Sequence, residues 1–111
     1  MSPVDLVPGG PVVCRGQLLP VPPGRYDWVR LRVAGGEPGA EETVWLHYRD
    51  GVDPEWLRIP PGDRDTVRSG VAVRVGVPRH DTLVAIRLPD RPALTVLTAS
   101  LVVLSGARVA R

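Results

Sequence analysis

Hydrophobic and polar residues alternate with a period of two along most of the chain, which is the pattern of β-strands that bury one face. The clearest alternating segments are residues 26–34, 42–48, 71–77, 83–88 and 94–104. Shorter candidates are residues 11–16, 17–21 and 56–59. Gly- and Pro-rich breakers separate these segments at short intervals, as in antiparallel sandwiches and barrels. The pattern therefore predicts an all-β protein, an antiparallel β-sandwich of about seven or eight strands.

The same pattern sets the expected domain organisation. With 111 residues, the chain has the length of one domain, and we expect residues 1–10 and 106–111 to be flexible ends. No segment keeps a 3.6-residue period, and the prolines would interrupt one. Residues 94–104 are long and apolar enough to predict a central strand that is buried on both faces.

Residues 26–34 and 42–48 flank a short Gly/Pro loop, and an antiparallel hairpin is the simplest connection between them. In that register Val33 lies near Val44, and Tyr48 points inward with the buried face. The opposite face then gathers large polar and aromatic side chains, and we predict a ligand site there: Trp28, Arg30, Arg32, Trp45, His47 and Arg49. Trp56 is left ambiguous by its neighbours.

Indoles with arginines on an exposed face usually contact a partner. Sugar rings stack their C–H faces on indoles, while Arg and His side chains donate to sugar hydroxyls. The alternative to a ligand site is a structural role: another strand, the N-terminal segment or a second subunit covers this face, because Trp is normally well buried.

Three stretches of the chain resemble a known family: GRYDWVRLRVAG, ETVWLHYRDGVDPEWLRIP and VAIRLPDRPALTVLTASLVV. They are similar to accessory jelly-roll domains of bacterial glycoside hydrolases, in the galactose-binding-like β-sandwich superfamily. The resemblance covers residues 24–104 and implies a non-catalytic carbohydrate-binding role. Such domains are usually longer between the strands that match EWLRIP and VAVRV, where this chain has only residues 60–70.

Metal and cofactor chemistry has weak support. Asp50, Asp53 and Glu55 offer the oxygen ligands that calcium prefers, but an Arg-Asp-Gly run is also an ordinary hairpin turn. His47 and His80 are the only histidines, too few for a cupin-type site. We therefore expect no cofactor, with a structural calcium as the minor alternative.

Catalysis is not predicted. No serine lies in a Gly-x-Ser-x-Gly elbow, and neither a Walker loop nor a dinucleotide fingerprint is present. The single cysteine, Cys14, is expected to be a small buried side chain. A cofactor-free cyclase or isomerase of secondary metabolism stays open, and would need an apolar cavity with a few polar groups.

The charge of the chain and its N-terminal sequence limit the classes of partner that we expect. All basic residues are arginine and the net charge is +2, a usage typical of a high-GC bacterium. Nucleic-acid binding through Arg30, Arg32, Arg74 and Arg87 is considered, but acids are nearly as frequent, so we expect no nucleic-acid partner. No apolar run approaches the ~18 residues of a membrane span, and the N-terminus does not resemble a secretory signal. We expect a cytoplasmic protein whose partner is a carbohydrate, another protein or a second copy of the chain.

Overall fold

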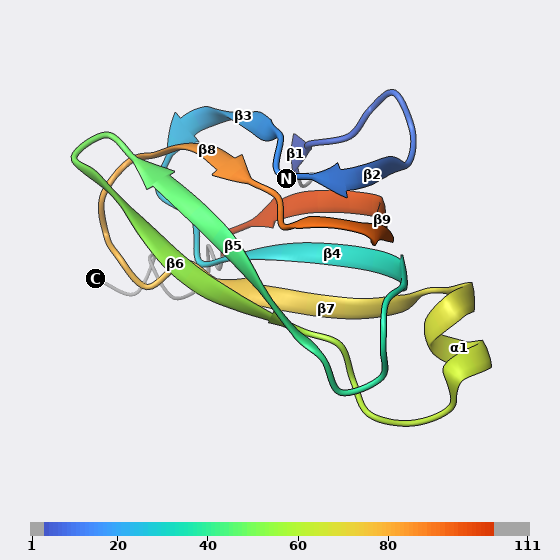
Figure 1. The fold of residues 1–111 in the computed structure, drawn as a ribbon. Coiled ribbons are helices and arrows are strands. Elements are labelled where there is room, and N and C mark those ends of the chain that lie inside the picture. The colour runs from blue at the N-terminus through green and yellow to red at the C-terminus, as the bar shows by residue number, and fades with distance from the viewer. Residues whose placement is uncertain (1–3, 104–111) are drawn as a thin grey trace.

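The computed structural model describes residues 4–103 and shows a β-sandwich of two packed antiparallel sheets (Figure 1). The five-stranded sheet contains β1 (Val4–Asp5), β2 (Val12–Arg15), β4 (Trp28–Gly35), β7 (Val71–Gly76) and β9 (Asp90–Val102). The four-stranded sheet contains β3 (Leu18–Gly24), β5 (Glu41–Tyr48), β6 (Gly51–Arg58) and β8 (Leu83–Arg87). The predicted all-β sandwich is therefore confirmed.

The order of the strands places β9 at the centre of the five-stranded sheet. It pairs with β4 along one edge and with β1 and β2 along the other, and β7 completes the sheet beyond β4. In the four-stranded sheet the order is β3, β8, β5, β6. The edges therefore fall at β3 and β6, where the prolines Pro20 and Pro54 remove no bond from a central ladder.

The core lies between the two sheets and is apolar. Alternate side chains of every long strand point inward, and no polar or charged residue of the described chain is buried. Tyr48 is buried as predicted, and so is Cys14. The largest fully buried side chains are Leu46, Leu57, Ile59, Leu83, Ile86, Leu88 and Leu94.

The predicted hairpin between residues 26–34 and 42–48 is wrong. Strand β4 pairs with β7 and β9, whereas β5 pairs with β6 and β8. The loop between β4 and β5 crosses from one sheet to the other, which a Gly/Pro-rich connection permits as readily as a hairpin turn. The true hairpin is β5–β6, whose last register pair is Tyr48 with Gly51.

Three further expectations are corrected. Residues 1–10 were expected to be a flexible end, but Val4–Asp5 pairs with β9, and Leu6 and Val7 are buried. Strand β9 begins at Asp90, earlier than expected, and only one of its faces is fully buried. Residues 64–69 form helix α1 (Arg64–Ser69), which leads into the start of β7 (Figure 1). The predicted flexible end at 106–111 lies outside the described residues.

Helix α1 is short, and the residues at its two ends explain where it begins and ends. The Asp63 side chain caps the first turn by accepting from the Asp65 backbone N–H, and Gly70 follows the last turn with φ +125°. Val67 is the one buried residue of the helix. One apolar side chain in six residues leaves no helical period to detect in the sequence.

Candidate functional site

The six residues predicted to form one site occupy two different surfaces. Trp28, Arg30 and Arg32 lie on β4 and point outward from the five-stranded sheet, since Val29, Leu31 and Val33 point into the core. Trp45 and His47 point outward from β5 in the four-stranded sheet, and Arg49 follows in the β5–β6 turn. The two outer faces of a sandwich look in opposite directions, so these sets cannot contact one ligand ring together.

Most of the exposed large apolar side chains lie on the outer face of the four-stranded sheet, which we call the Trp45 face. Trp45 is 40% exposed and Trp56 55%, and the others on this face are Leu18 and Val52. Trp45 lies opposite Pro54 of β6 and Arg87 of β8 in the strand register. Trp56 lies opposite Thr43, which resolves its ambiguous orientation as outward.

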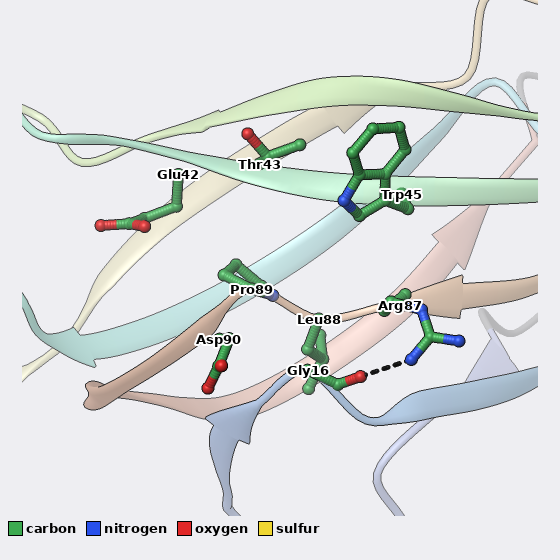
Figure 2. A pocket seen from close by; sticks show the side chains of 8 residues that line it. All are labelled: Gly16, Glu42, Thr43, Trp45, Arg87, Leu88, Pro89 and Asp90. Carbon is green, nitrogen blue, oxygen red and sulfur yellow. Dashed lines mark hydrogen bonds between the residues drawn. The ribbon is translucent and has the colours of Figure 1, made fainter.

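A groove of about 230 Å³ runs beside Trp45 where the sheet meets the start of β9 (Figure 2). Three elements line it: β5, the end of β8 with the residues after it, and the β2–β3 turn. Arg87 is held in place because its Nη1 donates to the Gly16 carbonyl oxygen at 2.7 Å. The lining residues are Gly16, Glu42, Thr43, Trp45, Arg87, Leu88, Pro89 and Asp90.

Two residues that line the groove carry carboxylates, Glu42 and Asp90. Arg91 Nε lies 3.2 Å from a Glu42 carboxylate oxygen, which orients the carboxylate at the groove wall. The Asp90 carboxylate has no hydrogen-bond or ion-pair partner among residues 4–103. The groove therefore combines an apolar ring face, two anionic acceptors and a guanidinium donor.

His47 lies on the same face, between Ala85 and Val52 in the register. Its side chain is half-buried, and its Nε2 is covered without a hydrogen-bond partner within the described chain. Neither His47 nor Arg49 lines the groove. Of the predicted set, only Trp45 does.

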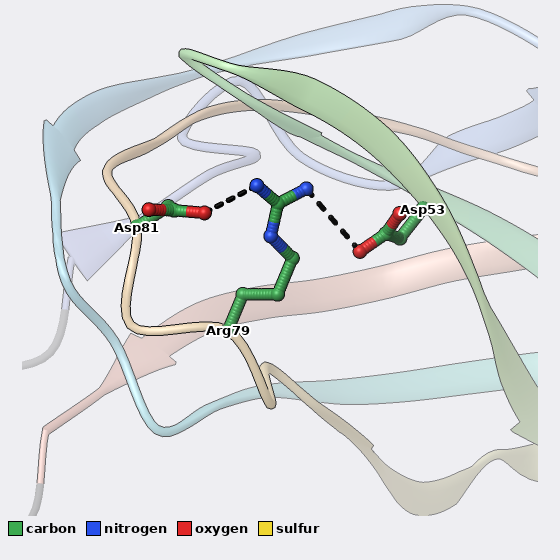
Figure 3. A network of polar contacts seen from close by, with 3 residues as sticks. All are labelled: Asp53, Arg79 and Asp81. Atoms are coloured by element: carbon green, nitrogen blue, oxygen red, sulfur yellow. Dashed lines mark hydrogen bonds and ion pairs between the residues drawn. The ribbon is translucent and has the colours of Figure 1, made fainter.

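A separate polar cluster lies at the β6 edge, where Arg79 forms ion pairs with Asp53 and Asp81 (Figure 3). The Arg79 guanidinium also lies over the Tyr48 ring, 4.6 Å from its centroid. The hydrogen bond to Asp81 raises the pKa of Arg79, and burial raises the pKa of Tyr48. Through this cluster the loop before β8 is joined to the edge strand β6 by one arginine.

The calcium candidates from the sequence are Asp50, Asp53 and Glu55. Asp53 is engaged by Arg79, and Asp50 lies in the β5–β6 turn. Across residues 4–103, no group of three or more His, Cys, Asp or Glu side chains could hold a metal ion. Cys14 is buried, and burial, together with the nearby Glu42 charge, raises the pKa of its thiol to about 11.

Sequence reasoning missed the polar half of the groove. Arg87 alternates outward in the β8 segment, and was considered only for nucleic-acid binding. Glu42 and Asp90 lie far apart in the sequence, and the pairing of β8 with β5 brings them to one groove. The alternating pattern predicts that Arg87 points outward, but it does not predict which strand pairs with β8.

Two negative findings complete the description. Within the described part of the chain, no helix has the length and apolar character needed to cross a membrane. No protein-family model matches the sequence, and no curated protein matches it significantly. The groove beside Trp45 therefore has to be interpreted from its own chemistry.

Proposed function

We propose that this protein is a non-catalytic carbohydrate-binding module and that the groove beside Trp45 receives the sugar. The single observation that carries the proposal is the exposed indole of Trp45 at a groove that also holds Arg87, Glu42 and Asp90. The resemblance of residues 24–104 to galactose-binding-like jelly-roll domains supports the same function.

The roles follow from the chemistry of each group. The indole of Trp45 stacks against the C–H face of a sugar ring. Asp90 accepts hydrogen bonds from sugar hydroxyls, and its carboxylate is free to do so. Arg87 donates to ring or hydroxyl oxygens from a position fixed by the Gly16 carbonyl. A shallow open groove of this size suits one or two sugar rings.

The test is a titration of the protein with neutral monosaccharides and short oligosaccharides, in which binding is measured by tryptophan fluorescence and by calorimetry. We expect weak binding, in the millimolar to micromolar range, by one sugar class. Trp45→Ala should weaken it about tenfold or more, as loss of an indole anchor does. Trp56→Ala is the matched control, because Trp56 is an exposed indole of the same face outside the groove.

The control decides where the sugar binds. Trp56→Ala should leave monosaccharide affinity within about twofold of the unmodified protein, since a change below 0.5 kcal/mol is the usual effect of a distant surface substitution. Equal losses from both variants would place binding outside the groove. A panel without any response would overturn the proposal.

A second candidate function is self-association through the Trp45 face. It is favoured by the exposed apolar side chains that gather there, Leu18, Val52 and Trp56 beside Trp45. Trp and Arg are enriched at protein interfaces, and the occupant would be a second copy of the chain. Light scattering after size exclusion tests it: a dimer that Trp56→Glu dissociates, with no sugar response, would replace the carbohydrate proposal.

The cyclase alternative and the calcium alternative have no comparable support. A cyclase needs an enclosed apolar cavity with polar groups, and the groove beside Trp45 is open to the surface. The ligand class, and not a reaction, is therefore the question to test first.

A further inference from the structure

The outer face of the five-stranded sheet carries three arginines on neighbouring positions, and we call it the arginine face. Arg30 of β4 is the direct register partner of Arg74 of β7. Arg32 follows two positions along β4, on the same side of the sheet. Directly opposed residues of an antiparallel pair lie about 5 Å apart at Cα. The pairing of β4 with β7 thus places three arginines at neighbouring positions on one face.

The positive charge of this face is not balanced by nearby carboxylates. Within residues 4–103, none of Arg30, Arg32 and Arg74 forms an ion pair. Asp5 is the one acid in their register rows, two strands away from Arg30, and its Oδ1 accepts from the Val7 backbone N–H. Of the other arginines in residues 4–103, 58, 64, 79 and 91 form ion pairs with acids, whereas 15, 25, 49, 68 and 87 form none.

Like charges directly opposite each other in a sheet destabilise it. Arg30 and Arg74 are such a pair, and an anion bound beside them would reduce the repulsion between their charges. A groove of about 240 Å³ is present at this point, lined by Arg30, Ala72, Val73 and Arg74. Guanidiniums bind carboxylate, sulfate and phosphate oxygens with two parallel hydrogen bonds, so they select oxyanions over other anions.

We propose that the arginine face binds the sulfate or carboxylate groups of an acidic polysaccharide. The groups beside the arginines suit a hydroxyl-rich polymer: Ser100 lies opposite Arg30, and Thr98 opposite Arg32. Arg74 is already ordered, because its guanidinium lies 4.7 Å from the centroid of the Trp28 ring. An anionic sugar chain laid across β4 would meet donors along its length.

A nucleic acid fits this face less well. Proteins that hold single strands stack bases on exposed aromatic rings, but the Trp28 ring is covered by Arg74. Duplex recognition places a helix or ribbon in the major groove, and the three arginines project from the flat face of a sheet. The chemistry of the face is therefore anion binding with hydroxyl contacts and without stacking.

The experiment compares four polymers of similar length by calorimetry at low salt: dextran sulfate, polygalacturonate, neutral dextran and a single-stranded oligonucleotide. We expect binding to dextran sulfate or polygalacturonate that weakens as NaCl is added, and no binding to neutral dextran. The polymer that binds more tightly identifies sulfate or carboxylate as the anion. Arg30→Gln should weaken binding about tenfold, as loss of one charge-assisted contact does.

Arg49→Gln is the matched control, because Arg49 is an exposed arginine without an ion pair, in the β5–β6 turn of the other sheet. It should change affinity less than about twofold. Equal losses from Arg30→Gln and Arg49→Gln would show attraction to net charge alone and overturn the proposal. Tighter binding of the oligonucleotide, lost in Arg30→Gln, would overturn the polysaccharide assignment.

This site is independent of the groove beside Trp45, since the two lie on opposite sheets. Trp45→Ala should leave binding of the acidic polymer unchanged. The carbohydrate proposal for the groove and this proposal for the arginine face can therefore fail separately.

Discussion

Gly35 at the end of β4 should be intolerant of any side chain. Alanine substitutions at three glycines measure the contributions to that cost in the free energy of unfolding. Its φ is +85°, in the left-handed region, and a Cβ added there would overlap the carbonyl oxygen of Ala93 in β9. Gly39 has a nearly equal φ of +80° with nothing within 4 Å of the added Cβ. Gly9 has open space and needs no left-handed backbone.

The three glycines separate the cost of a left-handed backbone from the cost of steric overlap with a neighbouring strand. Gly39→Ala should cost about 1 kcal/mol, the strain of a left-handed alanine less the gain from a stiffer unfolded chain. Gly35→Ala adds overpacking against a backbone atom, typically about 1–3 kcal/mol more, and should cost about 2–4 kcal/mol. Gly9→Ala should be neutral or slightly stabilising.

Urea unfolding followed by tryptophan fluorescence measures these differences. With a urea m-value of about 2 kcal/mol/M, a loss of about 3 kcal/mol lowers the midpoint by about 1.5 M. A loss of about 1 kcal/mol lowers it by only about 0.5 M. Equal losses for Gly35→Ala and Gly39→Ala would refute the reasoning, because the contact with Ala93 would then carry no cost.

Two further predictions concern stability. The pKa of the Cys14 thiol rises from 9.0 to about 11, through burial first and Glu42 second. The unfolded chain therefore loses this proton at lower pH, and the free energy of unfolding should fall as pH rises from about 9 to 11. Urea titrations at several pH values should show a shallower fall in Cys14→Ala; an unchanged slope would contradict the assignment. Asp63→Ala removes the α1 cap and should cost about 1 kcal/mol, measured by the same assay against Asp50→Ala, an exposed turn residue, as control.

The alternating pattern predicted where strands occur but not which strands pair. Val29, Leu31 and Val33 define the inner face of β4 whichever neighbour it has, so their burial was predictable. The neighbour depends on the path of residues 36–40, and a Gly/Pro loop is compatible with a hairpin or a crossing between sheets. This single choice decided whether Trp28 and Trp45 would share a surface.

Strand β6 shows a second limit. Only residues 56–59 were recognised, whereas the strand begins at Gly51. Pro54 and the inward-facing acids Asp53 and Glu55 break the usual alternation. The structure tolerates them because β6 is an edge strand and because Arg79 reaches across to pair with Asp53. Arg79 is distant from β6 in the sequence, so no local pattern predicts this strand.

The position of β9 has a consequence for how the chain folds. Strands β1, β2 and β4 lie early in the sequence, yet each pairs with β9, the last strand of the described chain. During synthesis these early strands lack their hydrogen-bonding neighbour until β9 has emerged from the ribosome. Pairings between distant segments also form slowly, because the loop-closure entropy comes before the contacts. The five-stranded sheet can therefore be completed only after β9 is available, and its unpaired early strands are the segments most exposed to aggregation until then.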